Sequence, residues 1–82
     1  MEITVYSTST CSFCHALMSW LDTNKIVYTK VVTDEDEAGM IEFMNVNDGM
    51  IGVPFTVIVD TNGNTTKISG YDQPKFKQVL GL

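Results

Sequence analysis

Two cysteines, Cys11 and Cys14, lie where a strand pattern ends and a helix pattern begins in this 82-residue sequence, and they limit the folds that it can adopt. Before the pair, residues Glu2 to Tyr6 form an apolar, β-prone run that predicts a strand. After it, apolar side chains recur with the spacing of one helix face, at Cys14, Leu17, Met18 and Leu21. We therefore expect a strand, a short polar loop and a helix that begins near Cys11 or Ser12 and ends by Asn24.

A position at a helix N-terminus favours thiol chemistry. The first turn of a helix carries backbone N–H groups without intrahelical partners and about half a positive charge, and both stabilise a thiolate. The pKa of a cysteine in such a place falls from about 8.5 into a range of about 3.5–7.5. Cys11 is therefore the predicted nucleophile. Cys14, one turn deeper on the apolar face, is the predicted resolving thiol that attacks the mixed disulfide.

The rest of the chain continues with strands that alternate with helical patterns. Residues Ile26 to Val32 and Phe55 to Asp60 are rich in β-branched or apolar side chains and predict two more strands. The Asn62-Gly63 turn signal predicts a hairpin that returns along Thr65 to Ser69.

Two further helices are predicted. The first follows the acidic stretch 33–37, where Thr33 or Asp34 can act as N-cap and the carboxylates lie near the positive end of the helix dipole. Its expected apolar side consists of Met40, Ile41, Phe43 and Met44. The second helix follows an N-cap at Asp72 or Gln73, and its inward side chains are expected to be Phe76, Val79 and Leu80. The order is strand, helix, strand, helix, strand, strand, helix, in one α/β domain over residues 1–82.

Composition limits the classes of partner. Ten acidic residues against five lysines give a net charge of -5, which argues against nucleic-acid binding. No apolar run approaches the length of about 18 residues that spans a bilayer, and the N-terminus has no basic leader with an apolar stretch. We therefore expect a cytoplasmic protein without a membrane partner. In that compartment a close cysteine pair is catalytic or metal-binding rather than a structural staple.

Alternative interpretations of the cysteine pair remain open at this point. With His15 the motif spells the c-type haem attachment pattern, although haem is normally attached outside the cytosol. A zinc site needs four ligands, and the chain supplies only two cysteines and one histidine. A dimer remains a further alternative, in which Cys11 of each subunit would bind a metal or an iron-sulfur cluster.

Four segments resemble glutaredoxins and the similar NrdH-redoxins in order and spacing: Tyr6-Ser7, Cys11-Ser12-Phe13-Cys14, Gly52-Val53-Pro54 and Ser69-Gly70-Tyr71-Asp72. The resemblance covers nearly the whole chain. It implies a thioredoxin-like fold, in which a four-stranded mixed sheet is flanked by three helices. It also implies that the peptide bond before Pro54 is cis and that this proline faces the cysteine pair.

The same resemblance implies a binding site for an extended, thiol-bearing peptide. Its expected residues are Ser12, Phe13, Val53, Pro54, Gly70, Tyr71 and Asp72. The backbone of Val53 would pair with the peptide like an added strand, and Gly70 would let the backbone approach the same ligand closely. The aromatic face of Phe13 would dock a partner beside Cys11.

Departures from the family pattern concern the electron donor. Glutaredoxins commonly carry a lysine shortly before the first cysteine that helps hold a glutathione carboxylate, whereas the loop here is Thr8-Ser9-Thr10. The Ser69-Gly70-Tyr71 segment, with a proline soon after it, is closer to NrdH-redoxins, which draw electrons from thioredoxin reductase. We therefore predict a monomeric dithiol carrier without a tightly bound cofactor, reduced by NADPH through thioredoxin reductase. Its expected substrates are protein disulfides, with ribonucleotide reductase a family-level candidate, and a glutaredoxin reduced by glutathione is the alternative.

Overall fold

The β-prone run at the N-terminus forms strand β1 (Glu2–Ser7), which lies inside a four-stranded sheet in the computed structural model. The structure describes residues 1–82. Strand β1 pairs in parallel with β2 (Thr29–Val32) and antiparallel with β3 (Phe55–Val59). Strand β3 pairs antiparallel with β4 (Thr65–Ser69), so the sheet order is β2-β1-β3-β4. The expected mixed sheet is confirmed.

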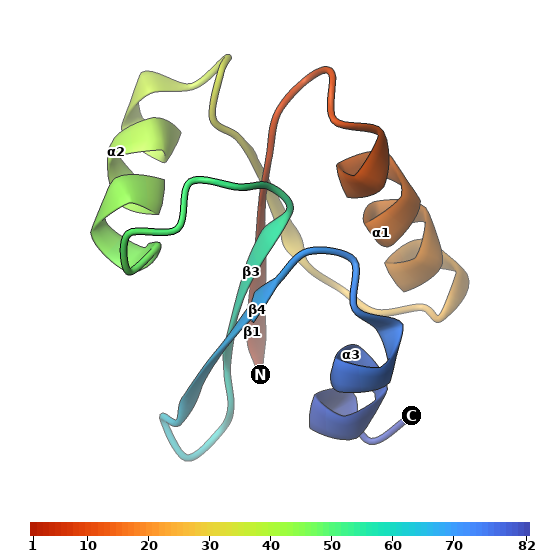
Figure 1. Ribbon diagram of the computed structural model, residues 1–82. Helices are drawn as coiled ribbons and strands as arrows, with labels where there is room; N and C mark the ends of the chain where they lie inside the picture. Colours follow the sequence, from red (N-terminus) through yellow and green to blue (C-terminus); the bar gives the residue numbers. More distant parts are fainter.

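Three helices cover the two faces of this sheet. Helices α1 (Ser12–Thr23) and α3 (Gln73–Leu80) lie on one face, and α2 (Glu37–Val46) lies on the other (Figure 1). The element order matches the order predicted from the sequence. None of the three helices has the length and apolar character needed to cross a membrane.

The α1/α3 face carries the larger core. Its cluster contains nine buried residues: Ile3, Val5, Cys14, Leu17, Met18, Leu21, Ile58, Ile68 and Phe76. The four positions predicted for the inner face of α1 are all buried there. The ring of Trp20 packs at the edge of this core, 6.0 Å from the ring of Phe76. Phe76 is buried as predicted, and Val79 and Leu80 are half-buried against the same cluster.

The α2 face is held by three aromatic side chains. The ring of Phe43 lies 5.5 Å from that of Tyr6 and 5.8 Å from that of Phe55. Burial and a hydrogen bond from the Tyr6 hydroxyl to Glu42 raise the pKa of Tyr6. Gly39 is buried as well, because α2 approaches the side chain of Val31 so closely that no Cβ fits between them.

Two predicted boundaries were wrong. Helix α2 is capped by Asp36, whose carboxylate accepts a 3.1 Å hydrogen bond from the Gly39 N–H, rather than by Thr33 or Asp34. The backbone N–H and hydroxyl of Thr33 both bond to Ser7, which keeps this residue beside the sheet. The second strand begins at Thr29 rather than at Ile26, because pairing with β1 starts only there.

The predicted apolar side of α2 was also wrong in part. Phe43 points into the core, but Met40, Ile41 and Met44 are 37%, 58% and 66% exposed. The contacting side of the helix is instead the one that carries Gly39 and Phe43. A helix face that packs through a glycine and one aromatic ring leaves the neighbouring apolar positions in contact with solvent.

Candidate active site

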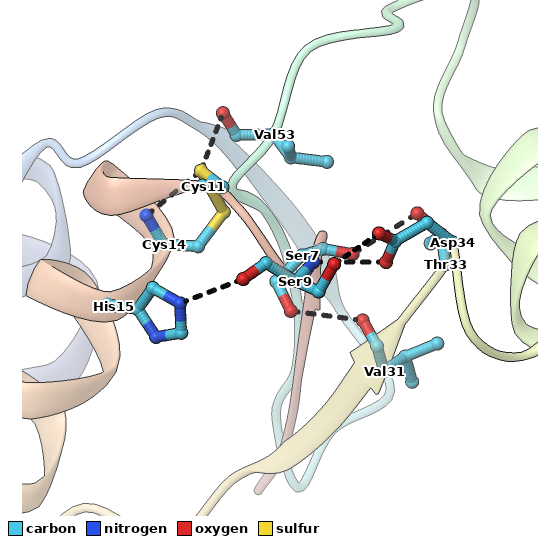
Figure 2. The surroundings of a disulfide bond; sticks show 9 residues. All are labelled: Ser7, Ser9, Cys11, Cys14, His15, Val31, Thr33, Asp34 and Val53. Carbon is cyan, nitrogen blue, oxygen red and sulfur yellow. Dashed lines mark hydrogen bonds between the residues drawn. A yellow bond between two sulfur atoms is a disulfide. The ribbon is translucent and has the colours of Figure 1, made fainter.

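Cys11 is the N-cap of α1, with an extended backbone at φ -84° and ψ 107°. Its sulfur accepts a hydrogen bond from the backbone N–H of Cys14 at 3.1 Å (Figure 2). The two cysteines form a disulfide with their Cα atoms 5.2 Å apart, so this is the oxidised form of the pair. The N-terminal N–H groups of a helix stabilise negative charge, so the same contact supports a thiolate on Cys11 after reduction.

The two cysteines differ in their access to solvent. Cys11 is half-buried at the mouth of the site, whereas Cys14 is 0% exposed and belongs to the nine-residue core. A helical spacing of three residues produces this difference, because it places the second sulfur about one turn deeper on the apolar face. Of the two cysteines, only Cys11 is therefore accessible from outside the protein.

The loop before β3 forms the opposite wall. The peptide bond between Val53 and Pro54 is cis, as the resemblance implied. The carbonyl oxygen of Val53 lies 3.8 Å from the sulfur of Cys11 (Figure 2). The carbonyl of Pro54 accepts a 2.8 Å hydrogen bond from Gly70, whose φ of +82° is one that residues with a side chain rarely adopt.

A groove of about 260 Å³ opens beside the disulfide. Its lining consists of Phe13, Val53, Pro54, Gly70 and Tyr71. These are five of the seven residues predicted to bind substrate. Phe13 is 67% exposed at its rim, and the hydroxyl of Tyr71 accepts a 2.6 Å hydrogen bond from the side chain of Gln73. The groove is therefore apolar with one fixed phenol, and no lysine lines it.

The other two predicted binding residues lie outside this lining. Ser12 is the exposed first residue of α1. Asp72 is the N-cap of α3, where its carboxylate accepts a 3.2 Å hydrogen bond from the backbone N–H of Lys75. The structure thus gives Asp72 a local role at a helix end, and a role in binding stays a prediction for both residues.

Sequence reasoning missed a polar connection on the other side of Cys11. The carboxylate of Asp34 accepts hydrogen bonds from the backbone N–H of Ser9 at 3.0 Å and from its hydroxyl at 2.5 Å (Figure 2). These bonds lower the pKa of Asp34, the hydroxyl contributing most. The available signal was topological, since the carboxyl ends of two neighbouring parallel strands meet at one edge of a sheet.

Apart from Asp34, charged and titratable side chains make few contacts near the two sulfurs. His15 is exposed, with Nε2 3.4 Å from the carbonyl of Ser9. The only ion pair joins Lys67 to Asp48 at 2.9 Å. No three His, Cys, Asp or Glu side chains come together in a way that could hold a metal ion within one chain.

An accessible N-cap cysteine joined to a buried cysteine one helical turn away can exchange disulfides with other thiols, which places the protein among thiol-disulfide oxidoreductases. Comparison with known proteins gives the family. The chain belongs to the glutaredoxins, since the glutaredoxin family model matches residues 3–62. A predicted glutaredoxin of Mycobacterium tuberculosis H37Rv is 32% identical over 77 residues, covering 94% of this chain and 89% of that protein.

Solved structures agree on the fold. A glutaredoxin from Methanosarcina mazei Go1 superposes with a TM-score of 0.81 at 21% identity, over 99% of this chain and 79% of that one. The glutaredoxin-like NrdH-redoxin from Escherichia coli superposes with a TM-score of 0.75 at 19% identity, over 96% and 95% of the two chains. The thioredoxin-like fold that the motifs implied is therefore confirmed.

Proposed function

We propose that this protein is a dithiol electron carrier in which Cys11 attacks the substrate and Cys14 resolves the mixed disulfide. The observation that carries the proposal is the difference in burial between the two sulfurs of one disulfide. An entering disulfide meets Cys11 first, and only an intramolecular thiol can reach the resulting bond from the core side. Burial also raises the pKa of a thiol in apolar surroundings, which suits a group that must wait until the first step is complete.

The exchange has two steps. The Cys11 thiolate attacks one sulfur of the substrate disulfide, so that a bond between Cys11 and the substrate forms and a substrate thiolate leaves. Cys14 then gives up its proton and attacks the Cys11 sulfur, which releases the second substrate thiol. The substrate gains two electrons, and the protein ends in the disulfide form that the structure describes.

The groove favours a protein or peptide as the reaction partner. Its apolar lining and the exposed ring of Phe13 suit an apolar side chain next to the reacting cysteine. The carbonyl of Val53, which faces the sulfur of Cys11, is placed to pair with an extended backbone, in the manner of an added strand. Glutathione carries two carboxylates, and neither the lining nor the loop Thr8-Ser9-Thr10 offers a cation to them.

We therefore propose thioredoxin reductase and NADPH as the electron source, and protein disulfides, with ribonucleotide reductase as a candidate, as the electron acceptors. The E. coli NrdH-redoxin, which shares the fold, has a thioredoxin-like activity profile. The net charge of -5 suits partners with basic surfaces around an apolar contact. The carrier is proposed to act as a monomer in the cytoplasm.

NADPH-coupled reduction of a protein disulfide tests the donor. The protein is supplied either with thioredoxin reductase or with glutathione and glutathione reductase. We expect turnover with the first system and less than a tenth of it with the second. The reverse ratio would make the protein a glutaredoxin that holds glutathione without a lysine before Cys11.

Cysteine variants test the assignment of roles. C11S is expected to abolish turnover, whereas C14S is expected to accumulate a mixed disulfide with the substrate that mass spectrometry locates on Cys11. An adduct on Cys14 in the C11S protein, formed as fast, would reverse the assignment. Colour in the purified protein, or a dimer that chelators dissociate, would instead favour the metal- or cluster-binding alternative.

A further inference from the structure

The N–H, the hydroxyl and the carbonyl of Ser9 all have polar partners, although Ser9 lies in an exposed loop. Its N–H and hydroxyl donate to the two oxygens of Asp34, at 3.0 and 2.5 Å. Its carbonyl faces Nε2 of His15 at 3.4 Å. Ser9 therefore connects the loop before α2 with the first turn of α1, two residues before the attacking cysteine (Figure 2).

Buried and half-buried hydrogen bonds at the end of β1 lie next to this connection. The carbonyl of Ser7 accepts from the N–H of Thr33 at 2.8 Å and from its hydroxyl at 3.1 Å. The hydroxyl of Ser7 donates to the carbonyl of Val31 at 3.3 Å. These contacts fix the end of β1 against the end of β2. The pair formed by Asp34 and Ser9 continues the attachment onto the loop that carries Cys11.

We propose that Asp34 is a positioning residue for the redox reaction, because through Ser9 it holds the loop that sets the place of the Cys11 sulfur. The carboxylate bonds to neither sulfur, so it acts through the backbone. In the oxidised protein the disulfide also fixes Cys11. In the reduced protein that tie is gone, and the backbone of Cys11 has two long hydrogen bonds, since its N–H donates to Thr8 at 3.4 Å and its carbonyl accepts from the N–H of His15 at 3.2 Å. The attachment at Ser9 then keeps the sulfur at the Cys14 N–H.

Removal of Asp34 should shift the pKa of Cys11 in one direction if Asp34 acts through its charge, and in the other direction if it acts by positioning the loop. A nearby negative charge disfavours a thiolate, so loss of the charge alone lowers the pKa of Cys11. Loss of the attachment moves the sulfur away from the helix N–H groups and raises that pKa. The sign of the change therefore distinguishes the two. Ser9→Ala adds a second test, because it removes a hydrogen bond and leaves every charge in place.

The experiment uses the reduced 82-residue protein and follows alkylation of Cys11 by iodoacetamide from pH 4 to pH 9, with the modified cysteine identified by mass spectrometry. D34A and S9A are expected to move the midpoint upward and to lower kcat/KM for a protein disulfide about three- to tenfold. D34N is expected to stay within about twofold, because its amide oxygen still accepts from the Ser9 N–H and its amide N–H can donate to the hydroxyl.

Glu35→Ala is the matched control. Glu35 neighbours Asp34, is exposed, and its side chain makes no hydrogen bond or ion pair, so this variant removes a charge of the same sign without the attachment. His15 is the other titratable side chain that contacts Ser9, and it is unchanged in every variant. E35A is expected to leave both the midpoint and kcat/KM unchanged.

A downward shift of the midpoint in D34A would overturn the proposal, because it would mean that charge dominates. An unchanged profile with only a lower melting temperature would also overturn it, because Asp34 would then be merely structural. The inference rests on Cys11 as the attacking thiol. If Cys14 is alkylated first in the unmodified protein, it is that assignment which fails, and the two failures are thus distinguishable.

Discussion

The two faces of the sheet are packed to different depths. Helices α1 and α3 cover one face with a cluster of nine buried residues, and α2 covers the other with a cluster of three. Cys14 belongs to the larger cluster, where it is 0% exposed. The larger cluster thus lies on the face that buries the Cys14 sulfur, and the smaller cluster lies on the face that α2 covers.

The α2 face of the sheet is packed through a different kind of contact. The ring of Phe43 lies 5.5 Å from that of Tyr6 and 5.8 Å from that of Phe55, and Gly39 brings the helix against β2. Apolar side chains on the neighbouring side of α2 stay exposed as a result, at Met40, Ile41 and Met44. Few close contacts therefore stabilise α2, and each of them should be sensitive to a small change in volume.

The largest expected effect compares one phenylalanine from each face. Phe76→Ala opens a cavity inside the nine-residue cluster and is expected to lower the free energy of unfolding by about 4–5 kcal/mol. Phe43→Ala should cost less, about 3 kcal/mol, because a thin layer can collapse onto the space. Urea denaturation of both variants measures the difference. Equal losses would show that the two faces are packed equally well in energetic terms.

Gly39→Ala tests the close approach of α2. A Cβ at this position would lie 2.5 Å from Cγ1 of Val31 and 3.2 Å from the carboxylate of Asp36. Alanine gains about 1 kcal/mol in helix propensity, but overpacking of this kind costs about 1–3 kcal/mol, and Val31 is stiff because it is β-branched. We expect a net loss of about 1 kcal/mol in thermal or urea unfolding. In a Val31→Ala background, Gly39→Ala should cause no such loss relative to Val31→Ala alone. A Gly39→Ala single variant that is more stable than the parent protein would mean that α2 shifts freely.

Thr56→Val is expected to stabilise the α1/α3 face of the sheet. The side chain is 0% exposed, its hydroxyl has no hydrogen-bond partner, and its neighbours across the sheet are Val5 and Ile68. A buried hydroxyl without a partner is unfavourable, so its replacement by a methyl group should raise the free energy of unfolding by about 1 kcal/mol. Val57→Thr, on the other side of the same strand, is a control that should not stabilise. A loss of stability in T56V would indicate that a buried water serves the hydroxyl.

The smallest expected effect is on acid stability. The pKa of Asp34 is lowered by the hydroxyl and N–H of Ser9, and that of Asp60 by the N–H groups of Asn64 and Asn62. A carboxyl group whose pKa is lower in the folded state stabilises the fold above its unfolded pKa of about 3.9. That contribution is lost as the pH falls through the folded pKa. Melting temperatures between pH 7 and pH 2 should therefore fall less steeply in D34N and D60N than in the parent protein. Parallel curves would mean that neither carboxylate differs between the two states.

Much of the fold was predictable because the signals are local. The apolar spacing from Cys14 to Leu21 fixed the inner face of α1, and the Asn62-Gly63 turn marked the hairpin. The start of α2 was not predictable in this way. Asp36 and Thr33 are both good N-caps by residue type, and only the pairing of Thr33 with Ser7 removes it from the helix.

The same distinction between local patterns and long-range contacts applies to the candidate site. The sequence by itself determined the motif, its place at a helix N-terminus and the depth of Cys14, since spacing and periodicity act within one segment. The family motifs had already implied that Pro54 faces the cysteine pair. Only the tertiary structure decided that the Val53 carbonyl lies 3.8 Å from the Cys11 sulfur, that α2 leaves Met40 and its neighbours exposed, and that Asp34 holds Ser9. These contacts join residues 25 to 42 positions apart or depend on how closely a helix approaches the sheet. Chain topology and packing set them, and no local pattern records either one.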